Sequence, residues 1–206
     1  MSPAAVACAL GAVLFGVAGW LGKRVAGRAY GDLVRYPDGP PALPAADGVF
    51  AAVAALIGAA VGLRPTPGWE VALLVFAVFA LAVCAATDMR SGRLPDPFTL
   101  LPLGVVLAAS AVRRDWAPLF GALFVLVPFG ALALFSRGRG MGWGDVKLAT
   151  FGGALLGMSG ITAAAAFAAL AAFAGGFAGG RLREPIAFGP YLALAIGVSL
   201  GLAGSA

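Results

Sequence analysis

The sequence predicts an all-α membrane protein with about eight transmembrane helices and its N-terminus on the outer side of the membrane. Of the 206 residues, 61% are hydrophobic and 11% are charged, whereas a soluble domain has about half apolar and about a quarter charged residues. Long apolar runs alternate with short polar segments that hold most of the Pro and charged residues. The 31 glycines are typical of helices that pack closely in lipid.

The composition also excludes several kinds of site. The chain has no His, and Cys8 and Cys84 each lie alone in an apolar run. We therefore expect no metal centre, cofactor or disulfide framework. The net charge of +5 comes from basic residues spread over short loops, so membrane topology explains it better than nucleic-acid binding does.

The apolar runs define the expected spans, because a transmembrane helix needs about 20 mainly apolar residues. Residues 1–68 are expected to form two helices joined by a cytoplasmic loop at 23–47, and residues 69–206 a six-helix core. Only Ser159 and Gly160 separate the sixth expected span from the seventh. The eight runs are Pro3–Leu21, Gly48–Leu63, Trp69–Thr87, Pro97–Val112, Trp116–Phe135, Val146–Met158, Ile161–Gly179 and Ile186–Ala203.

The basic residues predict the orientation, because Lys and Arg in short loops stay on the cytoplasmic side. The first run has basic residues only after it, which favours a retained helix over a cleavable signal peptide. With the N-terminus outside, three basic residues face outward, namely Arg64, Arg113 and Arg114. Eleven face inward: Lys23, Arg24, Arg28, Arg35, Arg90, Arg93, Arg137, Arg139, Lys147, Arg181 and Arg183.

Two acidic residues stand out among nine. Asp88 follows an apolar run at the C-terminal end of the third expected span, where the helix dipole disfavours an anion. It could be a surface acid paired with Arg90 or Arg93. Asp145 opens the sixth expected span, where it could serve as a helix N-cap. The predicted topology nevertheless brings Asp88 and Asp145 to the same face of the membrane.

Two apposed carboxyl groups that share a proton can hydrolyse a peptide bond without a metal. One activates a water, and the other protonates the carbonyl oxygen. Nearby glycines at 138, 140, 142 and 144 would let the backbone bend and a substrate strand approach closely. Asp88 and Asp145 are therefore the candidate catalytic residues.

Three segments in this order resemble the type IV prepilin peptidases, which are membrane aspartyl proteases with a Gly-x-Gly-Asp motif. The segments are Asp88-Met89-Arg90-Ser91-Gly92-Arg93-Leu94-Pro95-Asp96, Gly140-Met141-Gly142-Trp143-Gly144-Asp145-Val146-Lys147-Leu148 and Ile186-Ala187-Phe188-Gly189-Pro190-Tyr191-Leu192. The resemblance implies that Asp88 and Asp145 are the catalytic pair of a multi-pass protein of the bacterial inner membrane. Its partners would be prepilin or pseudopilin precursors, cut at the cytoplasmic face just before the pilin's hydrophobic helix.

The chain departs from that family in its first loop. Bifunctional members carry paired Cys-x-x-Cys motifs there, associated with zinc and N-methylation, whereas residues 23–47 contain no Cys. We therefore expect peptidase activity without methyltransferase activity. Leu94-Pro95-Asp96 replaces the more usual Ile-Pro-Asn, and Ala187 stands where Pro is common. Lys147 and Arg90 could bind the precursor, but positive-inside anchoring explains them equally well.

Other functions fit some of the same residues. Asp88, Asp96 and Asp145 could hold Mg²⁺ in a membrane phospho-transferase, since hard cations favour carboxylates. The aspartates could also carry protons in a small transporter, although coupling sites there tend toward the bilayer midplane. Phe188-Gly189-Pro190 could be an ordinary helix-entry bend, so we leave it outside the catalytic set. The sequence leaves open the precursor and the oligomeric state.

Overall fold

The computed structural model describes residues 2–30, 47–135, 142–178 and 187–202, without the side chains of residues 47 and 175–178. The regular secondary structure in this part of the chain is all α-helix, with no strand, which confirms the predicted all-α class. The helices are α1 (Pro3–Ala29), α2 (Asp47–Gly62), α3 (Gly68–Ser91), α4 (Pro97–Arg113), α5 (Ala117–Phe135), α6 (Trp143–Ala178) and α7 (Gly189–Leu202).

The number of membrane spans differs from the prediction. In the described residues, four helices are long and apolar enough to cross a membrane: α1, α3, α5 and α6. The predicted count of about eight spans is therefore wrong. Helices α2, α4 and α7 have only 16, 17 and 14 residues, whereas a span needs about 20.

The sixth and seventh expected spans are two limbs of α6. The backbone of Gly157 is not helical (φ 68°, ψ −175°) and divides α6 at this residue. Glycine adopts a positive φ without steric cost, so the chain turns here rather than in a loop. The expected break at Ser159 and Gly160 is displaced toward the N-terminus for this reason.

Helix α1 is longer than its apolar run. It begins at Pro3, where the Ser2 hydroxyl accepts a hydrogen bond from the backbone amide of Ala5 at 3.2 Å, as N-capping residues do. It then continues to Ala29, so the part of the predicted loop from residue 23 to 29 is helical. Residues 31–46 of that loop lie outside the described residues, and residue 47 already begins α2.

Close contacts between backbones join the helices in pairs. A Cβ atom added to Gly58 of α2 would lie 2.2 Å from the carbonyl oxygen of Gly11 of α1. A Cβ atom on Gly121 of α5 would lie 2.2 Å from the carbonyl oxygen of Gly153 of α6. Lipid tails are as apolar as the helices, so such small-residue packing is a main source of helix association in membranes.

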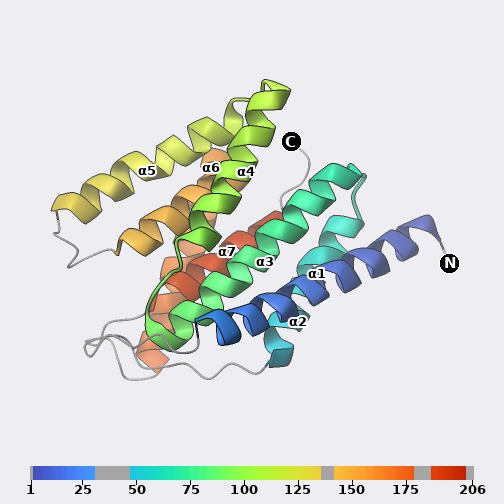
Figure 1. Cartoon of the computed structure of the whole chain (residues 1–206), viewed down its shortest axis with the longest axis horizontal. Helices are drawn as coiled ribbons and strands as arrows, with labels where there is room; N and C mark the ends of the chain where they lie inside the picture. The colour runs from blue at the N-terminus through green and yellow to red at the C-terminus, as the bar shows by residue number, and fades with distance from the viewer. Residues whose placement is uncertain (1, 31–46, 136–141, 179–186, 203–206) are drawn as a thin grey trace.

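Helix α3 runs through the middle of the bundle. Figure 1 shows α1 and α2 to one side of α3 and α4 and α5 to the other. Residues of α3, α6 and α7 share the largest apolar core, in which Cys84, Leu148, Phe151, Leu192 and Ile196 are fully buried. The C-terminal end of α3, which carries Asp88, is therefore held by helices from distant parts of the chain.

Alanine substitutions at two glycines should have opposite effects on stability. Gly58→Ala should lower the free energy of unfolding by about 1–3 kcal/mol, because its methyl group overlaps the backbone of α1. Gly104→Ala in α4 should be neutral or stabilise by roughly 0.5–1 kcal/mol, because nothing lies within 4 Å of its added Cβ atom and Ala favours helix. Unfolding in detergent measures both variants, and equal effects would contradict the packing of α1 on α2.

Candidate aspartate site

Four helix ends meet at one end of the bundle. A Cβ atom on Gly144, in the first turn of α6, would lie 3.0 Å from the Leu94 side chain in the connection from α3 to α4. The ammonium group of Lys147 in α6 lies 2.6 Å from a carboxylate oxygen of Asp96, which precedes α4. A Cβ atom on Gly189, the first residue of α7, would lie 2.6 Å from Oδ2 of Asp88 in α3.

Asp88 lies in the last turn of α3 and is buried, with 7% of its surface exposed. Helix α3 ends at Gly92, which has a left-handed backbone conformation (φ 66°) and donates its amide to the carbonyl oxygen of Asp88, as is typical of a helix C-terminus. The backbone amide of Gly189 faces the Asp88 carboxyl group. Oδ2 of Asp88 is buried and has no hydrogen-bond partner in the described part of the chain.

The polar neighbours of Asp88 within α3 are satisfied by their own helix. The Thr87 hydroxyl donates to the carbonyl oxygen of Val83 at 2.8 Å, and the Ser91 hydroxyl donates to that of Thr87 at 2.9 Å. Both side chains are buried. Because a buried polar atom without a partner costs free energy, the unpartnered oxygen of Asp88 favours a functional role over a structural one.

Asp145 is partly buried in the first turn of α6, two residues after its start. It is therefore not at the N-cap position that the sequence suggested. Its carboxyl group turns back to accept a hydrogen bond from the backbone amide of Gly142, and an added Cβ atom on Gly142 would lie 3.4 Å from its Oδ2. An acid at the third helical position that bonds back to the cap residue is one half of a capping box.

The two carboxyl groups lie at the same end of the bundle, and the charge of Asp145 acts on Asp88. Among the described residues, the charge that acts on Asp88 is that of an acid and not that of Arg90 or Arg93. Two buried or partly buried acids that interact are the arrangement that favours sharing one proton.

Asp96 does not join the pair. It is 60% exposed and forms its ion pair with Lys147, which is 29% exposed. Within the described residues, no three acidic or Cys side chains are grouped closely enough to hold a metal ion. This arrangement disfavours the predicted alternative of a Mg²⁺ site made by Asp88, Asp96 and Asp145.

Gly189 is the site residue that sequence reasoning left out. The sequence indicates a helix-entry bend beside the site for this segment, outside the catalytic set, and the structure has the backbone of Gly189 packed directly on the Asp88 carboxyl group. The order of the three motifs was the only signal that could have included it. Two of the glycines expected to bend before α6, Gly138 and Gly140, lie outside the described residues.

The arrangement is suited to acid–base chemistry on an amide. Two acids lie at one end of the bundle. Asp88 has an unpartnered oxygen, and each carboxyl group faces a backbone amide at the start of a helix, that of Gly189 for Asp88 and that of Gly142 for Asp145. One carboxylate can accept a proton from a water while the other donates a proton to a carbonyl oxygen.

Comparison with known proteins shows the family to which the chain belongs. The model of the type IV leader peptidase family matches residues 74–180, just over half of the chain and including both aspartates. The protein therefore belongs to the type IV leader peptidase family. Together with the four long apolar helices, this membership indicates a membrane protein.

Similar proteins include three prepilin leader peptidase/N-methyltransferases. The one from Burkholderia pseudomallei (strain 1026b) is 35% identical over 55% of this chain and 41% of its own length. Those from Aeromonas hydrophila and Aeromonas salmonicida (strain A449) are each 30% identical over 71% of this chain and 54% of their own length. This chain thus spans about half the length of these relatives. No solved structure matches the chain significantly.

Proposed function

We propose that this protein is a membrane aspartic endopeptidase that removes the leader peptide from prepilin-like precursors, with Asp88 and Asp145 as its catalytic pair. One observation carries the proposal: in a member of the type IV leader peptidase family, two carboxyl groups from separate helices interact at one end of the bundle. Its relatives are named for the same activity.

The surroundings of each aspartate suggest its role. Asp145 is only partly buried and lies in the first turn of α6, where the dipole of its own helix favours a negative charge, so we assign it as the base that activates the water. Asp88 has a buried, unpartnered oxygen at a helix C-terminus, so it holds the proton that is given to the scissile carbonyl oxygen. In the second step Asp145 gives the proton that it took from the water to the amine nitrogen, and the C–N bond breaks. Asp88 then takes back a proton from a hydroxyl group of the tetrahedral intermediate.

Charge supports cleavage on the cytoplasmic side of a bacterial inner membrane, with the N-terminus outside. The end of the bundle that holds the aspartates carries Arg28, Arg90, Arg93 and Lys147 among the described residues. Arg64, Arg113 and Arg114 lie at the opposite ends of their helices. Basic residues concentrate on the cytoplasmic side of membrane proteins, so this distribution favours the aspartate end as the inner one.

We also propose that the protein lacks N-methyltransferase activity, unlike the activity named for its relatives. The observation behind this proposal is that residues 23–47 contain no Cys. The precursor it cuts could serve a pilus, a secretion pseudopilus, a competence system or an adherence pilus.

The first prediction concerns the two aspartates. Asp88→Asn and Asp145→Asn should each lower leader removal by about 10²- to 10⁴-fold, the usual contribution of a general acid or base. The assay is co-expression with prepilins from the same genome, followed by mass measurement of the N-terminus.

The matched control for this experiment is Asp115→Asn. Asp115 lies in the connection from α4 to α5, where its Oδ1 accepts a hydrogen bond from the Ala117 amide, and Asn can keep that bond. This variant should cleave like the wild type. Full cleavage by both site variants would remove the proposed mechanism, and wild-type activity abolished by a chelator would revive the Mg²⁺ alternative.

A second prediction concerns the glycine beside Asp88. Gly189→Ala should strongly reduce cleavage while the protein remains folded, because the new methyl group displaces the Asp88 carboxyl group. Gly201→Ala in the same helix is the control, since its added Cβ atom would meet its nearest neighbour at an ordinary 3.6 Å. The measurement is the rate of leader cleavage by each purified variant in detergent. Equal rates for the two variants would show that the contact with Asp88 is unimportant.

A third prediction concerns methylation. Purified protein mixed with mature pilin and radiolabelled S-adenosylmethionine should transfer no label above background. A bifunctional relative serves as the positive control on the same pilin. Label transfer that requires this protein would overturn the proposal of a peptidase without methyltransferase activity.

A further inference from the structure

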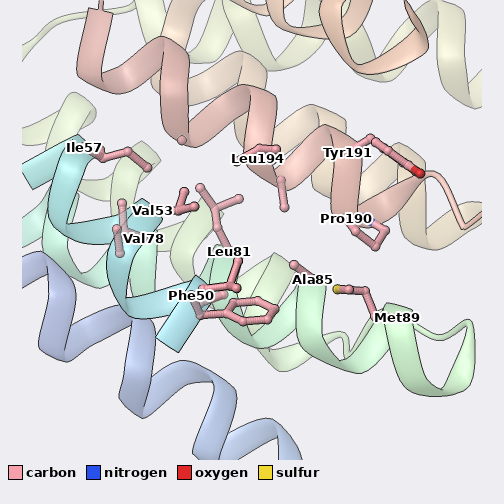
Figure 2. A pocket seen from close by; sticks show the side chains of 15 residues that line it. Phe50, Val53, Ile57, Val78, Leu81, Ala85, Met89, Pro190, Tyr191 and Leu194 are labelled. Atoms are coloured by element: carbon pink, nitrogen blue, oxygen red, sulfur yellow. The ribbon is translucent and has the colours of Figure 1, made fainter. Parts of the chain in front are cut away.

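An apolar cavity of about 300 Å³ lies between α2, α3 and α7. Figure 2 shows Val53 and Ile57 from α2, Val78 and Leu81 from α3, and Leu194 from α7 around this space. The cavity lining contains no charged residue in the described part of the chain. Its volume is at the lower end of the range for ligand pockets, about 300–1,000 Å³.

The cavity opens toward the outer surface of the bundle between α2 and α7. Val49 is 53% exposed and Leu194 is 40% exposed, and both belong to the lining. Two large apolar side chains at the mouth are suited to lipid or to an apolar polypeptide rather than to water. A ligand can therefore enter sideways from the membrane.

The cavity reaches the turn of α3 that carries Asp88 and the first turn of α7. Ala85 and Met89, which line it, lie on either side of Asp88 within one turn of α3, and Pro190 and Tyr191 directly follow Gly189. Figure 2 shows Met89 and Ala85 at the end of the cavity where Pro190 and Tyr191 enter from α7. Any polypeptide held at Asp88 has this apolar wall on one side.

The shape of the cavity limits what it can hold. Its lining on α3 extends from Val78 to Met89, which is about 16 Å at roughly 1.5 Å per residue. A whole helix with side chains is about 10–12 Å wide and would not fit into the enclosed volume. One face of a helix would fit, with anchoring side chains three or four residues apart.

We infer that this cavity binds one face of the apolar helix of the precursor, next to the bond that is cut. The inference rests on the proposed function. Basic residues such as Arg90 and Arg93 surround the aspartate end, whereas the cavity extends away from that end along α3. A precursor across the site therefore has its polar leader among the basic residues and its apolar segment in the cavity.

Cross-linking tests where the precursor helix lies. Leu194→Cys is made in a background with Cys8→Ala, Cys84→Ala and Asp145→Asn, so that an intact precursor stays bound. A precursor with one Cys, moved residue by residue after the cleavage site, is joined to it by a short bis-maleimide. Cross-linking should peak every three or four residues. Val17→Cys, an exposed position on α1 away from the cavity, should react several-fold less and without a period.

A rate measurement gives a second, independent test. Val53→Trp fills the cavity and should lower kcat/KM for the full precursor by about tenfold, which corresponds to roughly 1.4 kcal/mol. It should cut a short peptide that spans only the scissile bond at the wild-type rate. Val17→Trp should leave both rates unchanged.

The outcomes separate this inference from the proposed function. If the wild type cleaves the precursor, any one of three results would overturn the cavity assignment alone. These results are cross-linking without a period, equal cross-linking at Val17→Cys, and full activity of Val53→Trp on the full precursor. Loss of the short-peptide rate in Val53→Trp would place its defect at the aspartates and overturn the assignment as well. Failure of the wild type to cut any precursor would instead remove the proposed function itself.

Discussion

The structure depends on keeping a carboxyl group buried at the C-terminal end of a helix. The dipole of α3 disfavours a negative charge on Asp88, and its buried Oδ2 has no hydrogen-bond partner in the described part of the chain. The neighbouring elements hold it there instead: the backbone of Gly189 packs on one side and Asp145 acts on it electrostatically. An arrangement that costs stability and is still enforced by three helices is typical of a functional site.

The close packing of small residues is what lets these helices reach one another. Gly153 of α6 and Gly121 of α5 bring the two helix backbones into contact. This contact fixes the first limb of α6, which carries Asp145. Helix α7 is fixed at its other end, because the Arg64 guanidinium group donates hydrogen bonds to the carbonyl oxygens of Leu200 and Gly201. These are the last carbonyls of α7, which have no partners within the helix. Arg64 thus helps to hold the first turn of α7 against Asp88.

Much of this could be predicted from the sequence, because apolar runs in lipid must form helices. The bounds of α3, α4 and α5 differ from the predicted ones by a few residues at most. The count of spans could not be predicted in the same way. A run such as the one that became α7 can be apolar and still too short to cross the membrane alone, and a single glycine, Gly157, can divide a helix without a polar loop.

For the site, charge and orientation predict that Asp88 and Asp145 share one face of the membrane, and the structure has both at one end of the bundle. The position of the Asp145 carboxyl group depends on how α6 starts, which no pattern of apolar residues specifies. The contact between Gly189 and Asp88 joins residues far apart in the chain, and it depends on the packing of α7 into the core. The cavity between α2, α3 and α7 likewise arises from three helices whose relative positions the sequence does not reveal.

The most direct measurement of the central claim is a cross-link between the two aspartate positions. The protein carries Asp88→Cys and Asp145→Cys, with Cys8→Ala and Cys84→Ala, and is treated in membranes with a short bis-maleimide. Trypsin then cuts at Arg113 and Arg114, which are exposed between the two positions. The account predicts that the fragments stay joined, and that a control with cysteines at 88 and 115 separates. Separation of the fragments in both proteins would contradict the convergence of Asp88 and Asp145.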